Sequence, residues 1–249
     1  MSDDAILDVL HEAADSVVAV LASQEDWGPS GVRPGQYHPD LSADSAAVAV
    51  LGKSGLRVLS EESGLTDGDG PVAVLDPLDG STNASLPLPW YGTSICVVDD
   101  DGPRVSVVHD HASGLRFSAI RGDGAMLDDQ LLVRREPVEL TEAIVVVNAL
   151  PPAHGGWAQY RCMGATALDL CAVADGRFDG YIDYDNEALG PWDYMGALLV
   201  CREVGVDVVD AFGRELVVMD HAARRSPVAA AGPLLSKLVD LRLEAKLPD

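Results

Sequence analysis

Positive charge is scarce in this chain of 249 residues. Its 17 lysine and arginine residues stand against 40 aspartate and glutamate residues, which gives a net charge of −23. Only three of the basic residues are lysines: Lys53, Lys237 and Lys246. Because nucleic-acid backbones and anionic membranes repel such a chain, we expect neither as a partner. The composition suits a high-salt host, although a GC-rich genome produces the same bias.

Long apolar runs and paired cysteines are also missing. No stretch of about 18 uninterrupted apolar residues could span a membrane. The N-terminus, Met1–Asp4, lacks the basic start of a signal peptide, so we expect a soluble, cytoplasmic protein. Apolar residues make up 47% of the chain, which is enough for a sizeable core. The four cysteines form no CxxC pair, and we expect them to be buried free thiols rather than disulfide or zinc ligands.

Hydrophobic spacing predicts a change of architecture along the chain. We expect helices over residues 5–23, 45–51, 165–174, 193–204 and 233–246. We expect strands over residues 56–60, 72–76, 93–98, 104–109, 115–121, 143–147, 180–183, 216–219 and 227–231. The Gly- and Pro-rich residues 24–40 read as a loop. The first half therefore resembles an antiparallel meander, and the second half alternates strands with helices.

The ten residues 74–83, VLDPLDGSTN, carry the most information. Asp76 and Asp79 lie three apart at the end of an apolar strand, and such an oxygen-rich corner suits a hard cation such as Mg²⁺. Gly80 lets the backbone approach a ligand closely, and the two hydroxyl residues after it offer donors to an anion. Taken alone, the DPxD pattern is equally typical of an ordinary acidic turn.

Two further acidic motifs follow the same arrangement. Glu61-Glu62 ends a predicted strand, and alone it is most simply a solvated surface pair. Pro191-Trp192-Asp193 precedes a helix rich in small residues. Alone, Asp193 is most simply an N-cap and Trp192 a core residue.

Together the three motifs resemble the inositol monophosphatase family of Mg²⁺-dependent, lithium-sensitive phosphatases. Its members carry a Glu-Glu pair, an Asp-Pro-(Ile/Leu)-Asp-Gly-(Thr/Ser) motif and a late Trp-Asp, in this order. Smaller echoes lie between them, at 122–125 (GDGA) and 161–167 (RCMGATA). The resemblance runs from about residue 5 to residue 240. It implies a layered α/β/α/β/α sugar-phosphatase fold within the α/β (α+β) class.

The same resemblance implies one phosphatase domain over residues 1–249. Its antiparallel-sheet lobe would cover about 1–133 and its α/β lobe about 134–249, with the site between them. The family is commonly dimeric, so we expect a homodimer.

The resemblance also implies a set of metal ligands. Glu61 and Asp76 would share one Mg²⁺, with the backbone carbonyl of Leu78 as a further ligand. Asp76, Asp79 and Asp193 would hold a second ion. A third, weaker ion would rest on Glu61 and waters, which makes two or three ions in all.

Roles in catalysis and phosphate binding follow from the same motifs. The amides of Gly80 and Ser81 would bind the phosphate, with Thr82 beside them. Ser81 stands where the family has a Thr that orients the attacking water, and Asp44 is its natural partner. Asp44, Ser81 and Glu61 are therefore the candidate catalytic residues.

The sequence is less specific about the rest of the substrate. Many inositol-type members place a Glu seven residues before the late Asp, where it binds substrate hydroxyls. This chain has Asn186 there, with Glu187 beside it. Arg161 could bind substrate or pair with a carboxylate. The two histidines of His109-Asp110-His111 look like metal ligands, but the family has no metal there, and we expect structural roles.

Three hypotheses remain open. The first is a phosphatase of inositol phosphate, histidinol phosphate, fructose 1,6-bisphosphate or a related sugar phosphate. Its chemistry suits these residues, since Mg²⁺ activates water and neutralises an anionic transition state. The second is a 3′-phosphoadenosine 5′-phosphate phosphatase, and the third is a non-catalytic member that binds or regulates. The intact acidic residues favour an enzyme.

Overall fold

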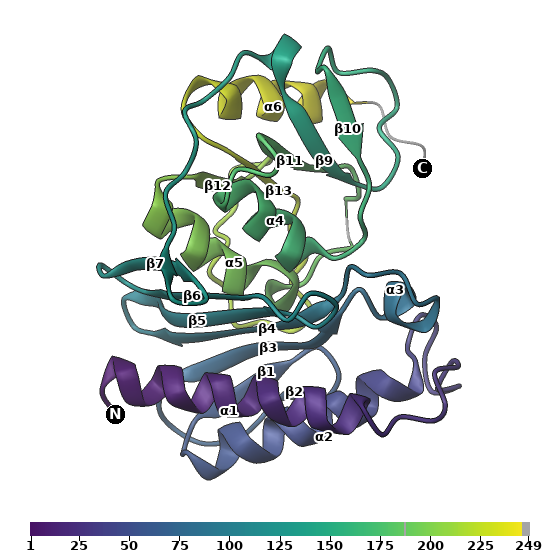
Figure 1. Cartoon of the computed structure of the whole chain (residues 1–249), viewed down its shortest axis with the longest axis vertical. Coiled ribbons are helices and arrows are strands. Elements are labelled where there is room, and N and C mark those ends of the chain that lie inside the picture. Colours follow the sequence, from purple (N-terminus) through teal and green to yellow (C-terminus); the bar gives the residue numbers. More distant parts are fainter. Residues whose placement is uncertain (187, 246–249) are drawn as a thin grey trace.

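The computed structural model describes residues 1–186 and 188–245, and its elements stack in five layers (Figure 1). Helices α1 (Asp3–Leu21) and α2 (His38–Lys53) cover one face of a larger sheet. Helices α4 (Thr166–Ala174) and α5 (Pro191–Val204) lie between this sheet and a smaller one. Helix α6 (Pro233–Glu244) covers the outer face of the smaller sheet. The expected α/β/α/β/α layering is confirmed.

The larger sheet has the strand order β2-β1-β3-β4-β5-β6-β7-β8. Its strands are β1 (Arg57–Ser60), β2 (Gly64–Leu65), β3 (Val72–Asp79), β4 (Gly92–Asp99), β5 (Gly102–Asp110), β6 (Arg116–Ile120), β7 (Gly124–Leu127) and β8 (Gln130–Leu131). Only β1 and β3 pair in parallel; the other described pairs are antiparallel. The short helix α3 (Ser81–Ser85) leaves the end of β3.

The smaller sheet has the order β10-β9-β11-β13-β12. Its strands are β9 (Ile144–Asn148), β10 (Gln159–Arg161), β11 (Gly180–Asp183), β12 (Asp207–Asp210) and β13 (Pro227–Ala230). Strands β10, β9 and β11 are parallel, whereas β13 and β12 run antiparallel to their neighbours. A one-turn 3₁₀ helix, η1 (Leu140–Glu142), precedes β9.

Close packing of α5 on the larger sheet joins the two halves of the molecule. A Cβ atom at Gly196 would lie 2.5 Å from Ser94 Oγ and 3.1 Å from Val108 Cγ2. Only glycine therefore lets the helix approach the strands this closely. Gly196 thus allows α5 to pack closely on β4 and β5.

Two predicted elements are wrong. Helix α2 begins at His38, inside the predicted loop, because Asp40 Oδ2 accepts a hydrogen bond from Tyr37 N at 2.7 Å and Pro39 occupies the first turn. Residues 216–219 form no strand; instead the carbonyl of Leu216 accepts a hydrogen bond from the Tyr194 hydroxyl at 2.8 Å. The edge strand beside β13 is β12.

No helix among the described residues combines the length and apolar character needed to cross a membrane. Of the four cysteines, Cys162 is exposed and the other three are buried, all as free thiols.

Candidate metal and phosphate site

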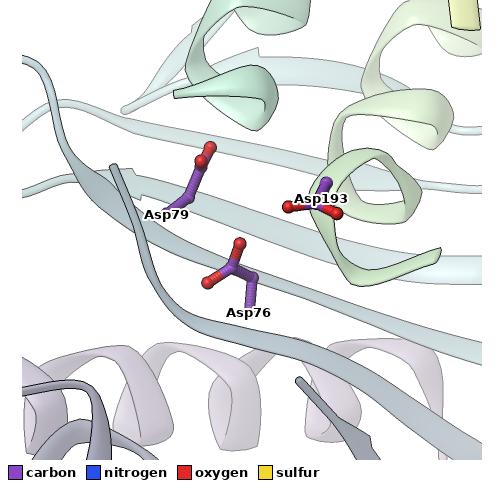
Figure 2. A group of neighbouring side chains, drawn as sticks. All are labelled: Asp76, Asp79 and Asp193. Carbon is purple, nitrogen blue, oxygen red and sulfur yellow. The ribbon is translucent and has the colours of Figure 1, made fainter. Parts of the chain in front are cut away.

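The acidic residues meet because β3 continues past Asp76, where it was predicted to end, as far as Asp79. All eight residues of β3 are buried. Its pairing with β4 shifts, since Asp76 lies opposite Ser94 and Asp79 opposite Gly92. One extra residue on β3 bends the strand and turns its side chains. Both carboxylates consequently face the same space (Figure 2).

Asp193 completes a cluster of three aspartates from two distant parts of the chain (Figure 2). It lies in the first turn of α5, where its Oδ2 accepts a hydrogen bond from Gly190 N at 2.6 Å. One carboxylate oxygen from each of Asp76, Asp79 and Asp193 lies within 4.8 Å of the others. Such spacing suits oxygen ligands arranged around a shared cation.

Burial and neighbouring acids disfavour the ionised forms of these carboxylates. Burial, and next the neighbouring Glu61, raise the pKa of Asp76 well above its ordinary value. Burial likewise raises the pKa of Asp79 to about 7 and, with repulsion from Glu61, that of Asp193. Burial and Glu62 raise the pKa of Glu61 to about 8. A divalent cation would favour the ionised forms and remove this penalty.

The cluster opens into a pocket of about 220 Å³. Its lining residues are Glu61, Asp76, Leu78, Asp79, Gly80, Ser81, Thr82, Gly164 and Asp193. All five predicted metal ligands and the predicted phosphate-binding turn therefore lie around one space. The carboxylate oxygens of this lining suit Mg²⁺, and the carbonyl of Leu78 remains a predicted further ligand.

Besides its predicted role as a metal ligand, Asp79 binds two backbone amides of the other half of the molecule. Its Oδ1 accepts a hydrogen bond from Thr166 N at 3.1 Å, and its Oδ2 accepts one from Ala167 N at 2.7 Å. These amides begin α4, so Asp79 caps a helix of the other half of the molecule. No local pattern in the sequence indicates this contact, because 87 residues separate Asp79 from Thr166.

The turn after Asp79 is fixed by equally close contacts. Gly80 has φ +81°, and a Cβ there would lie 2.9 Å from Trp90 O and 3.0 Å from Ala165 Cβ. Asn83 Nδ2 donates to Trp90 O at 2.7 Å and to Met163 O at 2.8 Å. These contacts fix the conformation of the predicted phosphate-binding turn.

Arg33 approaches the site from residues 24–37, and the sequence analysis did not single it out. Its Nη2 atom lies 3.3 Å from Glu61 Oε1 and 2.8 Å from Glu62 Oε1. Gln36 Nε2 also donates to Glu62. On the opposite side, His221 Nε2 lies 3.0 Å from the carbonyl oxygen of Glu61. No local pattern in the sequence indicates either contact, because Arg33 and His221 lie 28 and 160 residues from Glu61.

The acid beside Ser81 is Asp40, not Asp44. Burial raises the pKa of Asp40 to about 7, while hydrogen bonding from Tyr37 N and the Ser81 hydroxyl opposes the rise. Its Oδ1 is buried and has no close hydrogen-bond partner among the described residues, so a water could bind there. Asp44 instead accepts hydrogen bonds from the hydroxyls of Ser60 and Ser63.

The remaining predicted substrate residues differ in position. Thr82 lines the pocket, and its Oγ1 lies 3.3 Å from the Tyr37 hydroxyl. Arg161 lies outside the pocket lining; it is exposed on β10 and donates to Tyr160 O and Gln159 Oε1. Among the described residues Arg161 forms no ion pair within 4.0 Å, so its predicted pairing with a carboxylate is not present.

Asn186 follows β11 in the segment that leads to Asp193. Its Oδ1 accepts a hydrogen bond from Arg242 Nη2 at 2.6 Å, so this oxygen is already engaged. Glu187 lies outside the described residues.

His109 and His111 lie away from the cluster, beneath α1. Their ring centroids are 4.8 Å apart, and Thr93 Oγ1 lies 2.8 Å from His111 Nε2. Burial lowers the pKa of His109 to about 4 and that of His111 to about 3. Within the described part of the chain, the three aspartates form the only group of three or more metal-ligand side chains this close together.

The fold and the acidic pocket define a layered α/β protein with a cluster of three aspartates that could hold a cation, and solved structures share this fold. A Pyrococcus horikoshii protein, described as hypothetical with similarities for inositol-1 monophosphatase, superposes with a TM-score of 0.82. It is 21% identical, and the match covers 98% of each chain. The inositol monophosphatase from Anabaena gives a TM-score of 0.81 at 22% identity, over 98% of this chain and 97% of that one.

The chain belongs to the inositol monophosphatase family, whose model matches residues 51–242. Among curated relatives, the Nus factor SuhB of Pasteurella multocida is 33% identical over 96% of this chain and 90% of its own length. The resemblance read from the motifs is thereby confirmed, and it places the chain in a family of phosphatases.

Proposed function

We propose that this protein is a Mg²⁺-dependent phosphatase of a small phosphate monoester, such as inositol phosphate, histidinol phosphate or a sugar phosphate. The observation that carries this proposal is the buried cluster of Asp76, Asp79 and Asp193 beside the Gly80–Ser81 turn. Carboxylates with raised pKa values next to backbone donors suit a cation and a phosphate bound side by side.

Two or three Mg²⁺ ions would be held by Glu61, Asp76, Asp79 and Asp193, with the carbonyl oxygen of Leu78. When bound, Mg²⁺ supplies an acidified water and positive charge for the phosphoryl oxygens. The ions would also reverse the local effect of the chain's −23 charge, which otherwise repels an anionic substrate.

The protein's own groups orient the reactants. The amides of Gly80 and Ser81 bind the phosphate, since α3 begins at this turn. Asp40 accepts a proton from the attacking water or from the Ser81 hydroxyl, and the pair holds that water in line with phosphorus. Asp40 thus takes the role that the sequence analysis gave to Asp44.

The decisive test is phosphate release from a panel of substrates. It contains inositol 1-phosphate, histidinol phosphate, fructose 1,6-bisphosphate and 3′-phosphoadenosine 5′-phosphate, each with Mg²⁺ or with EDTA. Asp76→Asn is the best variant, because Asp79→Asn would also disturb the cap of α4. Exposed Asp101→Asn is the matched control.

We expect one preferred substrate, with activity lost in EDTA and in Asp76→Asn but kept in Asp101→Asn. Turnover of 3′-phosphoadenosine 5′-phosphate alone would favour the second hypothesis. No turnover of any substrate despite measured Mg²⁺ binding would overturn the proposal.

A non-catalytic role is the alternative that the comparisons make specific, because the Pasteurella relative is named a Nus factor. The intact cluster and the phosphate-binding turn favour catalysis in this chain. We further propose inhibition by millimolar Li⁺ and a homodimer in solution, which inhibition assays and light scattering would test.

A further inference from the structure

The irregular pairing of β3 with β4 lies between the first two aspartates of the cluster. There, Pro77 and Leu78 of β3 face the single residue Thr93 of β4. The extra residue interrupts the ladder of backbone hydrogen bonds, so this bend needs other contacts to hold its direction. The directions of Asp76 and Asp79 depend on the bend, because the two residues flank it.

The side chain of Thr93 supplies such a contact. Its hydroxyl donates to the carbonyl oxygen of Pro77 at 2.9 Å, and Thr93 is only 1% exposed. Two further restraints act nearby, since Leu78 N donates to Asp76 at 3.1 Å and the first amides of α4 donate to Asp79. Both of these engage the carboxylates that a cation would bind. Thr93 instead holds the backbone between the two aspartates and engages neither carboxylate.

His111 extends this contact into a chain of hydrogen bonds. Its Nε2 atom lies 2.8 Å from Thr93 Oγ1. A threonine hydroxyl carries one hydrogen, which Thr93 gives to Pro77, so it accepts the second bond from an Nε2–H group of His111. Burial lowers the pKa of His111 to about 3, so the ring is neutral near pH 7. Its Nδ1 atom is buried without a hydrogen-bond partner among the described residues, which agrees with a nitrogen that carries no hydrogen.

The end of β5 fixes the position of His111. The backbone N–H of His111 donates to Tyr91 O at 3.1 Å, and the ring centroids of Tyr91 and His109 lie 6.2 and 4.8 Å from its own. Asp110 forms the turn that follows, because its carboxylate accepts hydrogen bonds from the amides two and three residues later, at 2.9 and 3.1 Å. The His-Asp-His motif thus presents a donor in a fixed position beside β4.

We propose that Thr93 and His111 are positioning residues for the cation site. By fixing the carbonyl of Pro77, they fix the bend of β3 and so the directions of its two aspartates. The inference rests on the proposed function, and neither side chain lines the pocket of the aspartate cluster. Groups that orient metal ligands from behind commonly contribute about 10-fold to 100-fold to metal affinity or activity.

The experiment measures the Mg²⁺ dissociation constant of the whole chain by titration calorimetry, so it does not depend on turnover. Thr93→Val removes the hydroxyl, and Thr93→Ser keeps it. His111→Phe keeps a ring but removes the donor. Thr66→Val is the matched control, because the Thr66 hydroxyl also makes a hydrogen bond within the larger sheet, from Val58 N at 2.8 Å, away from the bend.

We expect Thr93→Val to raise the Mg²⁺ dissociation constant about tenfold, and Thr93→Ser and Thr66→Val to leave it within about twofold of wild type. His111→Phe should raise it by less, because Thr93 keeps its bond to Pro77. Adding His111→Phe to Thr93→Val should cause no further loss, because the two side chains act through one chain of hydrogen bonds. Ring-nitrogen NMR should show the hydrogen of His111 on Nε2.

A dissociation constant of Thr93→Val equal to that of wild type or of Thr66→Val would overturn the inference and leave the phosphatase intact. Additive effects of Thr93→Val and His111→Phe, or a hydrogen on Nδ1 of His111, would overturn the role of His111. If wild type bound no Mg²⁺, the proposed function and the inference would both fail. Mg²⁺ binding without turnover of any substrate would overturn the phosphatase alone. If Thr93→Val does not fold, the loss of affinity expected for His111→Phe carries the test.

Discussion

Asp76 is a carboxylate held at an energetic cost when no cation is present. Burial and the nearby acids raise its pKa, so the folded state resists its ionisation. Asp76→Asn removes the charge but keeps an oxygen for Leu78 N, which donates at 3.1 Å. We expect the metal-free variant at pH 8 to melt several degrees higher than wild type.

The same variant should lose the rise in melting temperature that Mg²⁺ gives to wild type, along with phosphatase activity. Scanning fluorimetry with a Mg²⁺ titration measures both shifts. A wild-type Mg²⁺ response that persists in Asp76→Asn would contradict the assignment of Asp76 as a ligand.

Asp40 and Asp44 give a second test at the scale of single residues. Asp40→Asn should lower kcat by about 10²-fold or more, as for loss of a general base or water-orienting group. Because burial raises the pKa of Asp40 to about 7 and Asn keeps an oxygen for Tyr37 N, the melting temperature above pH 7 should not fall. Asp44→Ala should instead weaken the fold by about 1–3 kcal/mol, because it removes the acceptor of the Ser60 and Ser63 hydroxyls, with kcat retained. A loss of kcat at Asp44 with kcat retained at Asp40 would show that Asp44, as first predicted, orients the water.

These two residues also show where the sequence stopped being informative. Asp76, Asp79 and Asp193 could be found because each belongs to a local motif next to a strand or helix end. Asp40 and Asp44 are one helical turn apart on the same face of α2, and both are buried. With the helix predicted to start at residue 45, nothing in the sequence could decide which of them faces Ser81.

Among the secondary-structure elements, α5 carries a contact that the sequence did not reveal. Glu203 Oε1 and Oε2 accept hydrogen bonds from Gly122 N and Gly124 N, each at 3.0 Å. The end of α5 thereby holds the turn between β6 and β7. We expect Glu203→Ala to cost about 1–2 kcal/mol of unfolding free energy, measured with urea, without changing KM. Exposed Glu136→Ala is the control, and equal costs would contradict this role.

The contribution of the interface between α1 and β5 to the free energy of unfolding should decrease at acidic pH. Since the pKa of His109 is about 4 in the folded protein and 6.5 is its ordinary value, the unfolded chain takes up the proton first. This contribution to stability is complete above pH 6.5 and declines as the pH falls toward 4. His11 and His111 have lowered pKa values there too, while Asp15 and Arg116 act on His109 with opposite signs.

A comparison of wild type with His109→Gln isolates the contribution of His109 to stability. The carboxylates with raised pKa values stabilise the fold as the pH falls, which is the opposite effect, but they do so in both proteins. Between pH 6.5 and pH 4, wild type should lose about 2 kcal/mol more than the variant. Urea denaturation at each pH measures the difference. If the free energies of unfolding of the two proteins changed with pH in parallel, protonation of His109 would cost the folded state no stability.

Elements themselves were predictable where periodicity was strong. The strand over 180–183 and the hairpin partners β4 and β5 lie where the alternation placed them. The start of α2 could not be predicted, because Gly and Pro in residues 28–35 suggested that the loop continued. Residues 216–219 look like a strand by composition, but a side-chain hydroxyl of α5, rather than a neighbouring strand, binds the carbonyl of Leu216.

For the whole molecule, the charge of −23 predicts a marked response to salt. Self-repulsion favours the expanded chain, and screening becomes effective when the Debye length falls to about 10 Å near 0.1 M salt. We expect the melting temperature to rise as KCl increases from about 10 mM to 1 M. Choline chloride should give the same rise if screening is the cause. A flat response to both salts would contradict this reading of the composition.

The layered architecture could be predicted at this scale because the family resemblance extended over most of the chain. The junction between the two sheets could not. It depends on Gly196 against β4, Asn83 bonding to Met163, and Asp79 at the start of α4. All three contacts join residues far apart in sequence, and none leaves a local pattern.

Asp79 is both a predicted metal ligand and the acceptor for two backbone amides of α4, and this has a consequence for the evolution of the family. A descendant that lost the proposed catalysis could replace Asp76 or Asp193 at the loss of one backbone hydrogen bond each, from Leu78 N or Gly190 N, while removal of the charge relieves repulsion. It could not replace Asp79 without freeing the amides of Thr166 and Ala167. Retention of Asp79 alone is therefore a poor marker of an enzyme among homologous sequences, whereas the joint survival of Asp76 and Asp193 marks a lineage still under selection for chemistry.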